Sequence, residues 1–260
     1  MRIVNLSSGS EGNCTFIETD KTKLLLDDGI NATQTLEKLK ALAIDPSRLT
    51  AIVVSHEHSD HVKGIDVLAS KLNIPVFAHQ QVWVGLDEKL KKVPLKNRKV
   101  FDGKFEINDL VISPVALPHD VPCFGFSFEQ DDKKVAVATD LGHFNDKIIS
   151  ALSGSRLVYI ESNYDRELLY KGTKYPLSLK RRIDGPNGHL SNVDSGDALE
   201  RLALSGTRQF VLAHLSKENN SPSLAYSTVC GFLQKDGIEE GRDLKIDVAT
   251  TSIGTIFRLK

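Results

Sequence analysis

The segment SHEHSDH, residues 55–61, restricts the fold of this chain more than any other stretch. It follows the apolar run TAIVV, which predicts a buried strand, so three histidines and an aspartate stand at a strand end. Grouping imidazoles in this way costs desolvation free energy unless a cation offsets it. The segment therefore predicts a metal site, and its donors suit Zn²⁺, Mn²⁺ or iron. The candidate ligands are His56, His58, Asp60 and His61.

Four more potential ligands stand where apolar runs stop. Each follows a segment that predicts a strand, namely KLLLD, VISPVAL, VAVATD and QFVLAH. Because strand ends meet at the rim of a sheet, we expect these side chains to line one pocket with the histidine segment. Any one of them could cap a turn, but the repetition at four strand ends favours a shared site. The four residues are Asp27, His119, Asp140 and His214.

The remaining pattern predicts two blocks of strands, each closed by helices. Apolar spacing predicts helices over residues 33–43, 62–72, 193–204 and 224–233. Two such blocks favour two sheets that pack face to face with helices outside. The composition shows no linker or low-complexity tract, so we expect a single domain over residues 1–260.

Charge and cysteine content narrow the functional classes. The net charge of −1 argues against capture of nucleic acid by the whole surface, although basic runs occur at residues 89–104 and 166–189. Cys14, Cys123 and Cys230 are isolated, so we expect core residues and no disulfide framework. Neither a signal peptide nor an apolar span of about 18 residues is visible, so we expect a cytoplasmic protein that does not enter a membrane. The oligomeric state stays open.

The order Asp, HxHxDH, His, Asp, His resembles the metallo-β-lactamase fold superfamily along nearly the whole chain. This resemblance implies an α/β (α+β) fold, a four-layer αββα sandwich with a binuclear metal site at one edge of the sheets. It implies one divalent ion on His56, His58 and His119, and a second on Asp60, His61 and His214. Asp140 would bridge the two ions, and Asp27 would orient the histidine segment by hydrogen bonding.

Further motifs resemble the bacterial YycJ/WalJ family within that superfamily. They are SGSEGN with Ser8 and Asn13, ESNYD with Asn163, and NGHLSN with His189. Members of the family are described as DNA exonucleases that work in the 5′ to 3′ direction. The resemblance therefore implies nucleic acid, in particular DNA, as the partner, with Ser8, Asn13 and Asn163 as candidate substrate contacts.

We accordingly predict a phosphodiesterase in which a metal-bridging hydroxide attacks phosphorus. Asp60 and His189 are the candidate catalytic residues, and His189 would stabilise or protonate the leaving oxygen. The basic residues expected along the nucleic-acid backbone are Lys180, Arg181 and Arg182. Two alternatives stay open: a small-molecule hydrolase, either a thioesterase of the glyoxalase II type or a cyclic phosphodiesterase, and a non-catalytic metal-binding regulatory partner.

Overall fold

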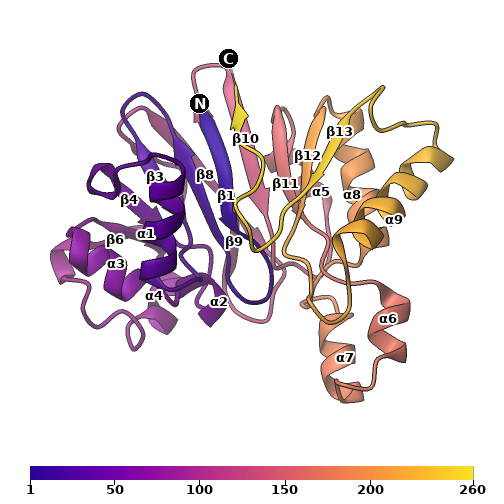
Figure 1. The fold of residues 1–260 in the computed structure, drawn as a ribbon, viewed down its shortest axis with the longest axis horizontal. Coiled ribbons are helices and arrows are strands. Elements are labelled where there is room, and N and C mark those ends of the chain that lie inside the picture. Colours follow the sequence, from indigo (N-terminus) through magenta and orange to yellow (C-terminus); the bar gives the residue numbers. More distant parts are fainter. Residues whose placement is uncertain (260) are drawn as a thin grey trace.

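Two seven-stranded sheets form the centre of the computed structural model, which describes residues 1–259 (Figure 1). The strands of the first sheet lie in the order β14 (Phe257–Arg258), β1 (Arg2–Ser7), β2 (Cys14–Glu18), β3 (Lys23–Leu26), β4 (Ala51–Val53), β5 (Val76–His79) and β6 (Arg98–Phe101). Those of the second lie in the order β13 (Lys245–Val248), β12 (Gln209–Ala213), β11 (Leu157–Glu161), β10 (Lys133–Ala138), β9 (Cys123–Gln130), β8 (Leu110–Leu117) and β7 (Phe105–Ile107).

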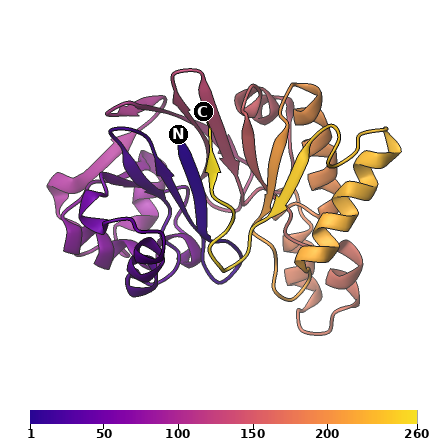
Figure 2. The same ribbon diagram turned by 45° about the horizontal axis from the view of Figure 1, so that its top comes forward.

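Helices cover the outer face of each sheet (Figures 1 and 2). The helices beside the first sheet are α1 (Ala32–Ala41), α2 (Ser59–Val62), α3 (Ile65–Leu72) and α4 (Gln80–Leu86), with short 3-10 turns at Pro46–Arg48 and Leu95–Asn97. Those beside the second are α5 (Asp146–Leu152), α8 (Asn192–Leu204) and α9 (Pro222–Lys235). The pair α6 (Arg166–Lys171) and α7 (Leu177–Ile183) projects from the lower edge in Figure 1. The expected αββα sandwich is confirmed.

Alternating side chains explain why both faces of each sheet are buried. In β4, Ile52 packs under the helices of the first sheet, whereas Ala51 and Val53 face the second sheet. Large side chains from the second sheet, such as Phe126 and Tyr159, fill the space between the sheets. This period of two follows from strand geometry, and it places an apolar layer on each side of each sheet.

Parallel pairing gathers strand ends at one edge. Strand β3 pairs in parallel with β4, and β10, β11 and β12 pair in parallel with one another. The carboxyl ends of these strands therefore point the same way within each sheet, and the candidate ligands follow them. The carboxyl end of β3 lies at Leu26, that of β10 at Ala138 and that of β12 at Ala213.

Two details differ from the sequence pattern. The helix expected over residues 62–72 is divided into α2 and α3, because the chain turns at Gly64 beside a buried carboxylate. A Cβ at Gly64 would lie 2.4 Å from Asp28 Oδ2, so only glycine fits. The last strand, β14, returns to the first sheet and pairs with β1, so the two blocks are not strictly successive. Within residues 1–259, no helix combines the length and hydropathy that a membrane crossing requires.

Candidate metal centre

Three of the candidate site residues end their strands in a left-handed backbone conformation. Asp27, Asp140 and His214 have φ angles of 59°, 66° and 56°. This conformation is costly for residues with a Cβ and persists where the surrounding structure holds it, often at functional sites. Asp27 and His214 come directly after β3 and β12, and Asp140 comes two residues after β10. The strand ends therefore fix the backbone of three candidate ligands.

His56, His58 and His119 form the first cluster of potential metal donors. Their donor atoms lie within 4.8 Å of one another, and His119 Nε2 is 3.4 Å from His58 Nδ1. His56 is fully buried, and its Nε2 has no hydrogen-bond partner among the described residues. Burial and the nearby positive charge of His61 hold the pKa of His56 well below its ordinary value. His56 is therefore a neutral imidazole whose unpaired nitrogen suits a metal ion.

Asp60, His61 and His214 form the second cluster. Asp60 Oδ2 lies 3.6 Å from His61 Nε2 and 3.4 Å from His214 Nε2. Asp140 lies between the clusters, because its Oδ2 is 3.2 Å from His61 Nε2 and it also groups with His56. This Oδ2 is buried and makes no hydrogen bond within the described chain.

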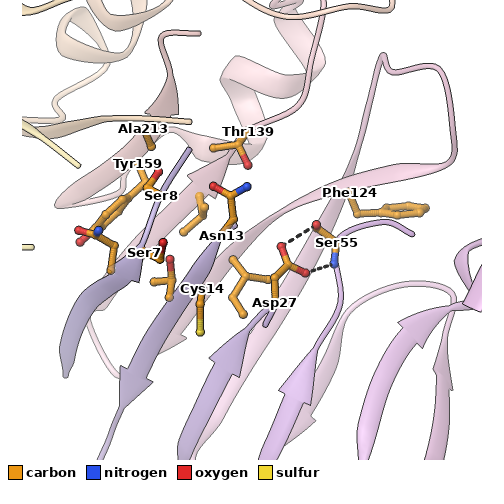
Figure 3. A pocket seen from close by; sticks show the side chains of 14 residues that line it. Ser7, Ser8, Asn13, Cys14, Asp27, Ser55, Phe124, Thr139, Tyr159 and Ala213 are labelled. Carbon is orange, nitrogen blue, oxygen red and sulfur yellow. Dashed lines mark hydrogen bonds between the residues drawn. The ribbon is translucent and has the colours of Figure 1, made fainter. Parts of the chain in front are cut away.

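Asp27 and Ser55 hold the ring of His61 from behind. Asp27 accepts a hydrogen bond from the Ser55 backbone N–H at 2.8 Å and from Ser55 Oγ at 2.7 Å (Figure 3). Its Oδ2 also accepts from His61 Nδ1 at 2.8 Å. Because Nδ1 is occupied, Nε2 of His61 is the nitrogen that faces Asp60 and Asp140.

Glu161 connects the second cluster to His189, a link that the sequence did not reveal. It is fully buried at the end of β11, and its Oε1 lies 2.7 Å from His214 Nδ1 and 3.0 Å from His189 Nδ1. Its Oε2 accepts from the backbone N–H groups of Leu141 and Leu190. Burial alone would raise the pKa of Glu161, but the charges of His189 and His214 and their hydrogen bonds to this carboxylate lower it to about 2. The position of Glu161 at a strand end, as in Asp27 and Asp140, was the signal available in the sequence.

The electrostatics of the centre fit divalent cations. Asp140 and the other carboxylates raise the pKa of His61 well above its ordinary value and that of His214 to about 10, although burial acts in the opposite direction. Protons on these imidazoles therefore balance the buried carboxylates when no cation does. Together with the unpaired atoms His56 Nε2 and Asp140 Oδ2, this is the donor set that a hard or borderline cation satisfies.

A pocket of about 300 Å³ opens in front of the clusters. Its lining includes members of both clusters, His189 and side chains of α7 and the turn before it. Arg182 lies at its rim and pairs with Asp120 through Nη2 and Nε, the latter at 2.9 Å. The lining residues are Ser10, His58, Asp60, His119, Asp120, Asp140, Asn163, Tyr175, Leu179, Arg182, Ile183, Asn187, Gly188, His189 and His214.

Ser8 and Asn13, expected as substrate contacts, are not part of the lining of this pocket. They line a cavity of about 20 Å³ between the sheets, on the same side as Asp27 (Figure 3). Ser8 Oγ accepts from the His214 backbone N–H at 2.8 Å, and Asn13 Nδ2 is 3.0 Å from His61 Nε2. Both residues are buried and contact candidate ligands, while Ser10 of the same loop lines the pocket; their role as substrate contacts stays a prediction.

The basic run of α7 divides into three different environments. Lys180 is buried, and its Nζ donates to the carbonyl oxygens of Tyr170, at 2.9 Å, and Gly172, so it does not reach the pocket. Arg181 is exposed but outside the described pocket lining, whereas Arg182 lines it. The helix period separates neighbouring side chains by about 100°, so three consecutive basic residues cannot share one face.

Asn163 lies in the pocket, as expected, but also supports His214. Its Nδ2 donates to the His214 carbonyl oxygen at 2.7 Å. Its backbone N–H donates to the carbonyl oxygen of Leu190, next to His189. Asn163 thus connects the loop of His189, through its backbone, with the end of β12, through its side chain.

An αββα sandwich with histidine and carboxylate clusters at one sheet edge defines the class of metallo-β-lactamase fold hydrolases. A sequence model described as the Beta-lactamase superfamily domain matches residues 22–215, and the chain belongs to this superfamily of metal-dependent hydrolases. Within it, the chain is similar to the exodeoxyribonucleases YycJ and WalJ. YycJ of Bacillus anthracis is 34% identical over 245 residues, covering 93% of this chain and 92% of that protein. WalJ of Streptococcus pneumoniae is 36% identical over 247 residues, covering 93% and 91%.

Solved structures agree on the fold. The metallo-beta-lactamase fold protein YhfI from Bacillus subtilis superimposes with a TM-score of 0.73 at 16% identity, covering 99% of both chains. The Zn²⁺-bound PqqB from Methylobacterium extorquens superimposes with a TM-score of 0.72 at 14% identity, covering 100% of both chains. At these identities the likeness concerns the fold alone.

Proposed function

We propose that this enzyme is a metal-dependent phosphodiesterase, specifically a DNA exonuclease that digests in the 5′ to 3′ direction. The observation that carries the proposal is the placement of His189. Its Nδ1 is held by Glu161, it lines the pocket, and it stands beside both donor clusters. This chain aligns with almost the whole length of the YycJ and WalJ relatives, and their names as exodeoxyribonucleases support DNA as the substrate.

The residues fit a site for two divalent ions, either zinc, manganese or iron. We assign His56, His58 and His119 to one ion because their donor atoms form one group. The second ion would be held by Asp60, His61 and His214, with Asp140 between the two. When bound, such a pair of cations acidifies water and neutralises charge on a phosphoryl group. Asp27 orients His61 by accepting its Nδ1 proton.

His189 acts on the leaving oxygen. With Nδ1 bound to Glu161, Nε2 is the nitrogen available to a substrate in the pocket. The negative charge of Glu161 raises the pKa of His189, although burial opposes this, so the ring carries a proton that it can donate or share. Asp60, whose pKa is lowered by hydrogen bonding from His214 against the effect of burial, keeps its negative charge beside the pocket.

The substrate phosphate enters past Arg182. This side chain is the member of the basic run that lines the pocket, and its guanidinium suits a phosphate oxygen pair. We also infer that residues 1–260 act as one domain, because side chains of both sheets share one core. DNA as the substrate implies the cytoplasm as the place of action.

An activity panel tests the proposal. Metal-free protein reconstituted separately with Zn²⁺, Mn²⁺ and Fe²⁺ is given single and double strands of DNA and RNA, labelled at the 5′ or the 3′ end. We expect mononucleotides to be released from the 5′ end of DNA, and His189→Ala to lower turnover about 10²- to 10⁴-fold with metal content unchanged. Endonucleolytic fragments, or release from the 3′ end, would contradict the proposed polarity.

The size of the pocket favours one alternative, a hydrolase of small phosphodiesters. A pocket of about 300 Å³ is enclosed enough for a small ligand, so bis-p-nitrophenyl phosphate, a cyclic nucleotide and an acylglutathione belong in the same panel. Turnover of the cyclic nucleotide or the thioester without digestion of any polymer would replace the exonuclease by that activity.

A further inference from the structure

The pocket in front of the metal centre has two chemically different walls. One carries the candidate metal ligands, and the other is apolar and consists of Tyr175, Leu179 and Ile183. Leu179 and Ile183 are four residues apart and share one side of α7, and Tyr175, in the turn that precedes the helix, lines the same pocket. All three side chains are half-buried, so part of each surface stays open to the pocket. The metal centre does not require an apolar wall, and this wall therefore points to a ligand with an apolar part.

Internal contacts of α6 and α7 fix this wall in place. The buried Lys180 Nζ donates to the carbonyl oxygen of Tyr170 at 2.9 Å, which binds α7 to the end of α6. At the carboxyl end of α7, Asp184 accepts from Tyr170 Oη at 2.8 Å and from Arg166 Nε at 3.1 Å. Contacts at the middle and at the carboxyl end of α7 therefore restrain the helix that carries Leu179 and Ile183, so little ordering cost opposes binding against them.

The dimensions of the pocket restrict what can enter. Its volume of about 300 Å³ is near the lower end for small-molecule sites. A duplex does not enter a space of this size, whereas one unstacked nucleotide does. A nucleotide also has the two parts that the walls require, an anionic phosphate for the metal side and a flat base for the apolar side.

We propose that Tyr175 and Leu179 form a subsite for the nucleobase adjoining the cleaved phosphodiester. The base stacks on the ring of Tyr175 and packs on Leu179, while the phosphate lies between the metal ligands and Arg182. This inference rests on the proposed function and specifies its substrate unit as one terminal nucleotide separated from its neighbours. Because every base has a face that can stack, the subsite accepts all four bases.

Equilibrium binding tests the subsite without relying on turnover. Metal-loaded protein is titrated with dAMP and with 2-deoxyribose 5-phosphate, which share the sugar and phosphate but differ by the base. We expect the wild type to bind dAMP about 5- to 150-fold more tightly, the factor that corresponds to one stacked base. Tyr175→Ala should lose this preference, and Tyr175→Phe should keep it because the ring remains.

A matched control lies two residues further along. Leu177 is 53% exposed and does not line the pocket, so Leu177→Ala should keep the wild-type preference. Equal binding of the two probes by the wild type, binding of neither, or an unchanged preference in Tyr175→Ala would overturn the subsite.

Kinetics separate the subsite from the proposed function. On single-stranded DNA, kcat/KM is compared for an ordinary and an abasic terminal residue, at whichever end the wild type digests. For the wild type we expect kcat/KM to be about 5- to 150-fold lower with the abasic terminal residue. For Tyr175→Ala we expect nearly the same kcat/KM with both substrates. If the abasic residue lowered kcat/KM equally in the two proteins, the subsite would be refuted while the proposed nuclease activity would stand. A wild type that digests no DNA would refute the proposed function, and the binding comparison would still decide the subsite.

Discussion

Replacing Glu161 with Gln tests whether one buried carboxylate positions both His189 and His214. The glutamine has nearly the same shape but no charge. Its NH2 group replaces one acceptor oxygen by a donor, although the surrounding groups are themselves donors. Glu161 Oε1 is approached by both Nδ1 atoms, at 3.0 and 2.7 Å, and Oε2 accepts from two backbone N–H groups. At least one of these donors therefore loses its partner in the variant.

The pKa of Glu161 gives the expected magnitude. Against the effect of burial, His189 and His214 lower it from 4.5 to about 2, so the folded protein favours the charged form. A shift of roughly 2.5 units corresponds to about 3 kcal/mol of unfolding free energy. Because the folded pKa is depressed, this contribution is complete above pH 4.5 and disappears as the pH falls toward 2. Glu161→Gln should therefore lower the unfolding free energy by about 3 kcal/mol at pH 7 and by progressively less below pH 4.5.

Urea unfolding of the metal-free proteins, followed by the fluorescence of Trp83, measures this difference. Trp83 is the only tryptophan in the sequence, and it lies on α4. Glu129→Gln is the matched control, since Glu129 is a half-exposed residue of the same sheet whose nearest cation, Lys134 Nζ, is 3.9 Å away. The reasoning fails if Glu161→Gln unfolds at the urea concentration of the wild type, or if the difference does not shrink in acid.

The same variant has a second consequence at the metal centre. The charged acceptor of the His214 Nδ1 proton is replaced by a neutral amide, so the affinity for metal should fall about 10- to 100-fold. Competition with a chromophoric chelator measures this affinity. A variant that is less stable but binds metal as tightly as the wild type would show that Glu161 has a structural role only.

Three further changes test separate parts of the site. Metal binding at pH 7 should release protons from His61 and His214, because nearby carboxylates raise their pKa values against the effect of burial. The affinity for metal should therefore rise with pH. Titration calorimetry in two buffers of different ionisation enthalpy would detect the released protons, and identical heats in both buffers would exclude their release. Burial raises the pKa of Asp28 to about 7, so its ionisation lowers the unfolding free energy of the metal-free protein as the pH rises from about 4 to 7. Asp28→Asn should remove up to about 4 kcal/mol of this decrease in unfolding free energy. An equal pH dependence of unfolding in both proteins would contradict this prediction. Arg182→Gln should reduce the slope of log K against log salt for DNA binding by about 1, and an unchanged slope would remove Arg182 from the phosphate contacts.

The chemistry of single segments was predictable from the sequence. The histidine segment is local, and the other donors stand at strand ends that an apolar run followed by a polar residue reveals. The sequence DDKK at residues 131–134 is typical of a hairpin turn, and β9 and β10 do pair there, with Gln130 opposite Lys133. These features depend on short-range pattern, which is why the sandwich and the gathering of strand ends could be anticipated.

Features that depend on distant partners could not be predicted. Glu161 is 28 residues from His189 and 53 from His214. The parallel pairing of β11 with β12 brings Glu161 beside His214, and the loop before α8 carries His189 to the same carboxylate. The exposure of Lys180 and Arg182 likewise depends on which side of α7 packs against α6. Ser8 and Asn13 stand in a turn of small polar residues between β1 and β2, and their burial against His214 and His61 depends on contacts with segments far away in the sequence.

The pairing of Arg182 with Asp120 explains how a protein of net charge −1 can act on a polyanion. Asp120 Oδ1 lies 3.4 Å from His58 Nε2 and 3.3 Å from His119 Nε2, and its other oxygen accepts from Arg182. A substrate phosphate must therefore compete with Asp120 for Arg182, so this arginine attracts the phosphate less strongly than an unpaired arginine would. The remaining attraction comes from cations in the donor clusters, which act only over a short distance. Selection by charge thus occurs inside the pocket, and the base, which reaches the wall of α7 only when the phosphate is in place, adds the second condition for binding.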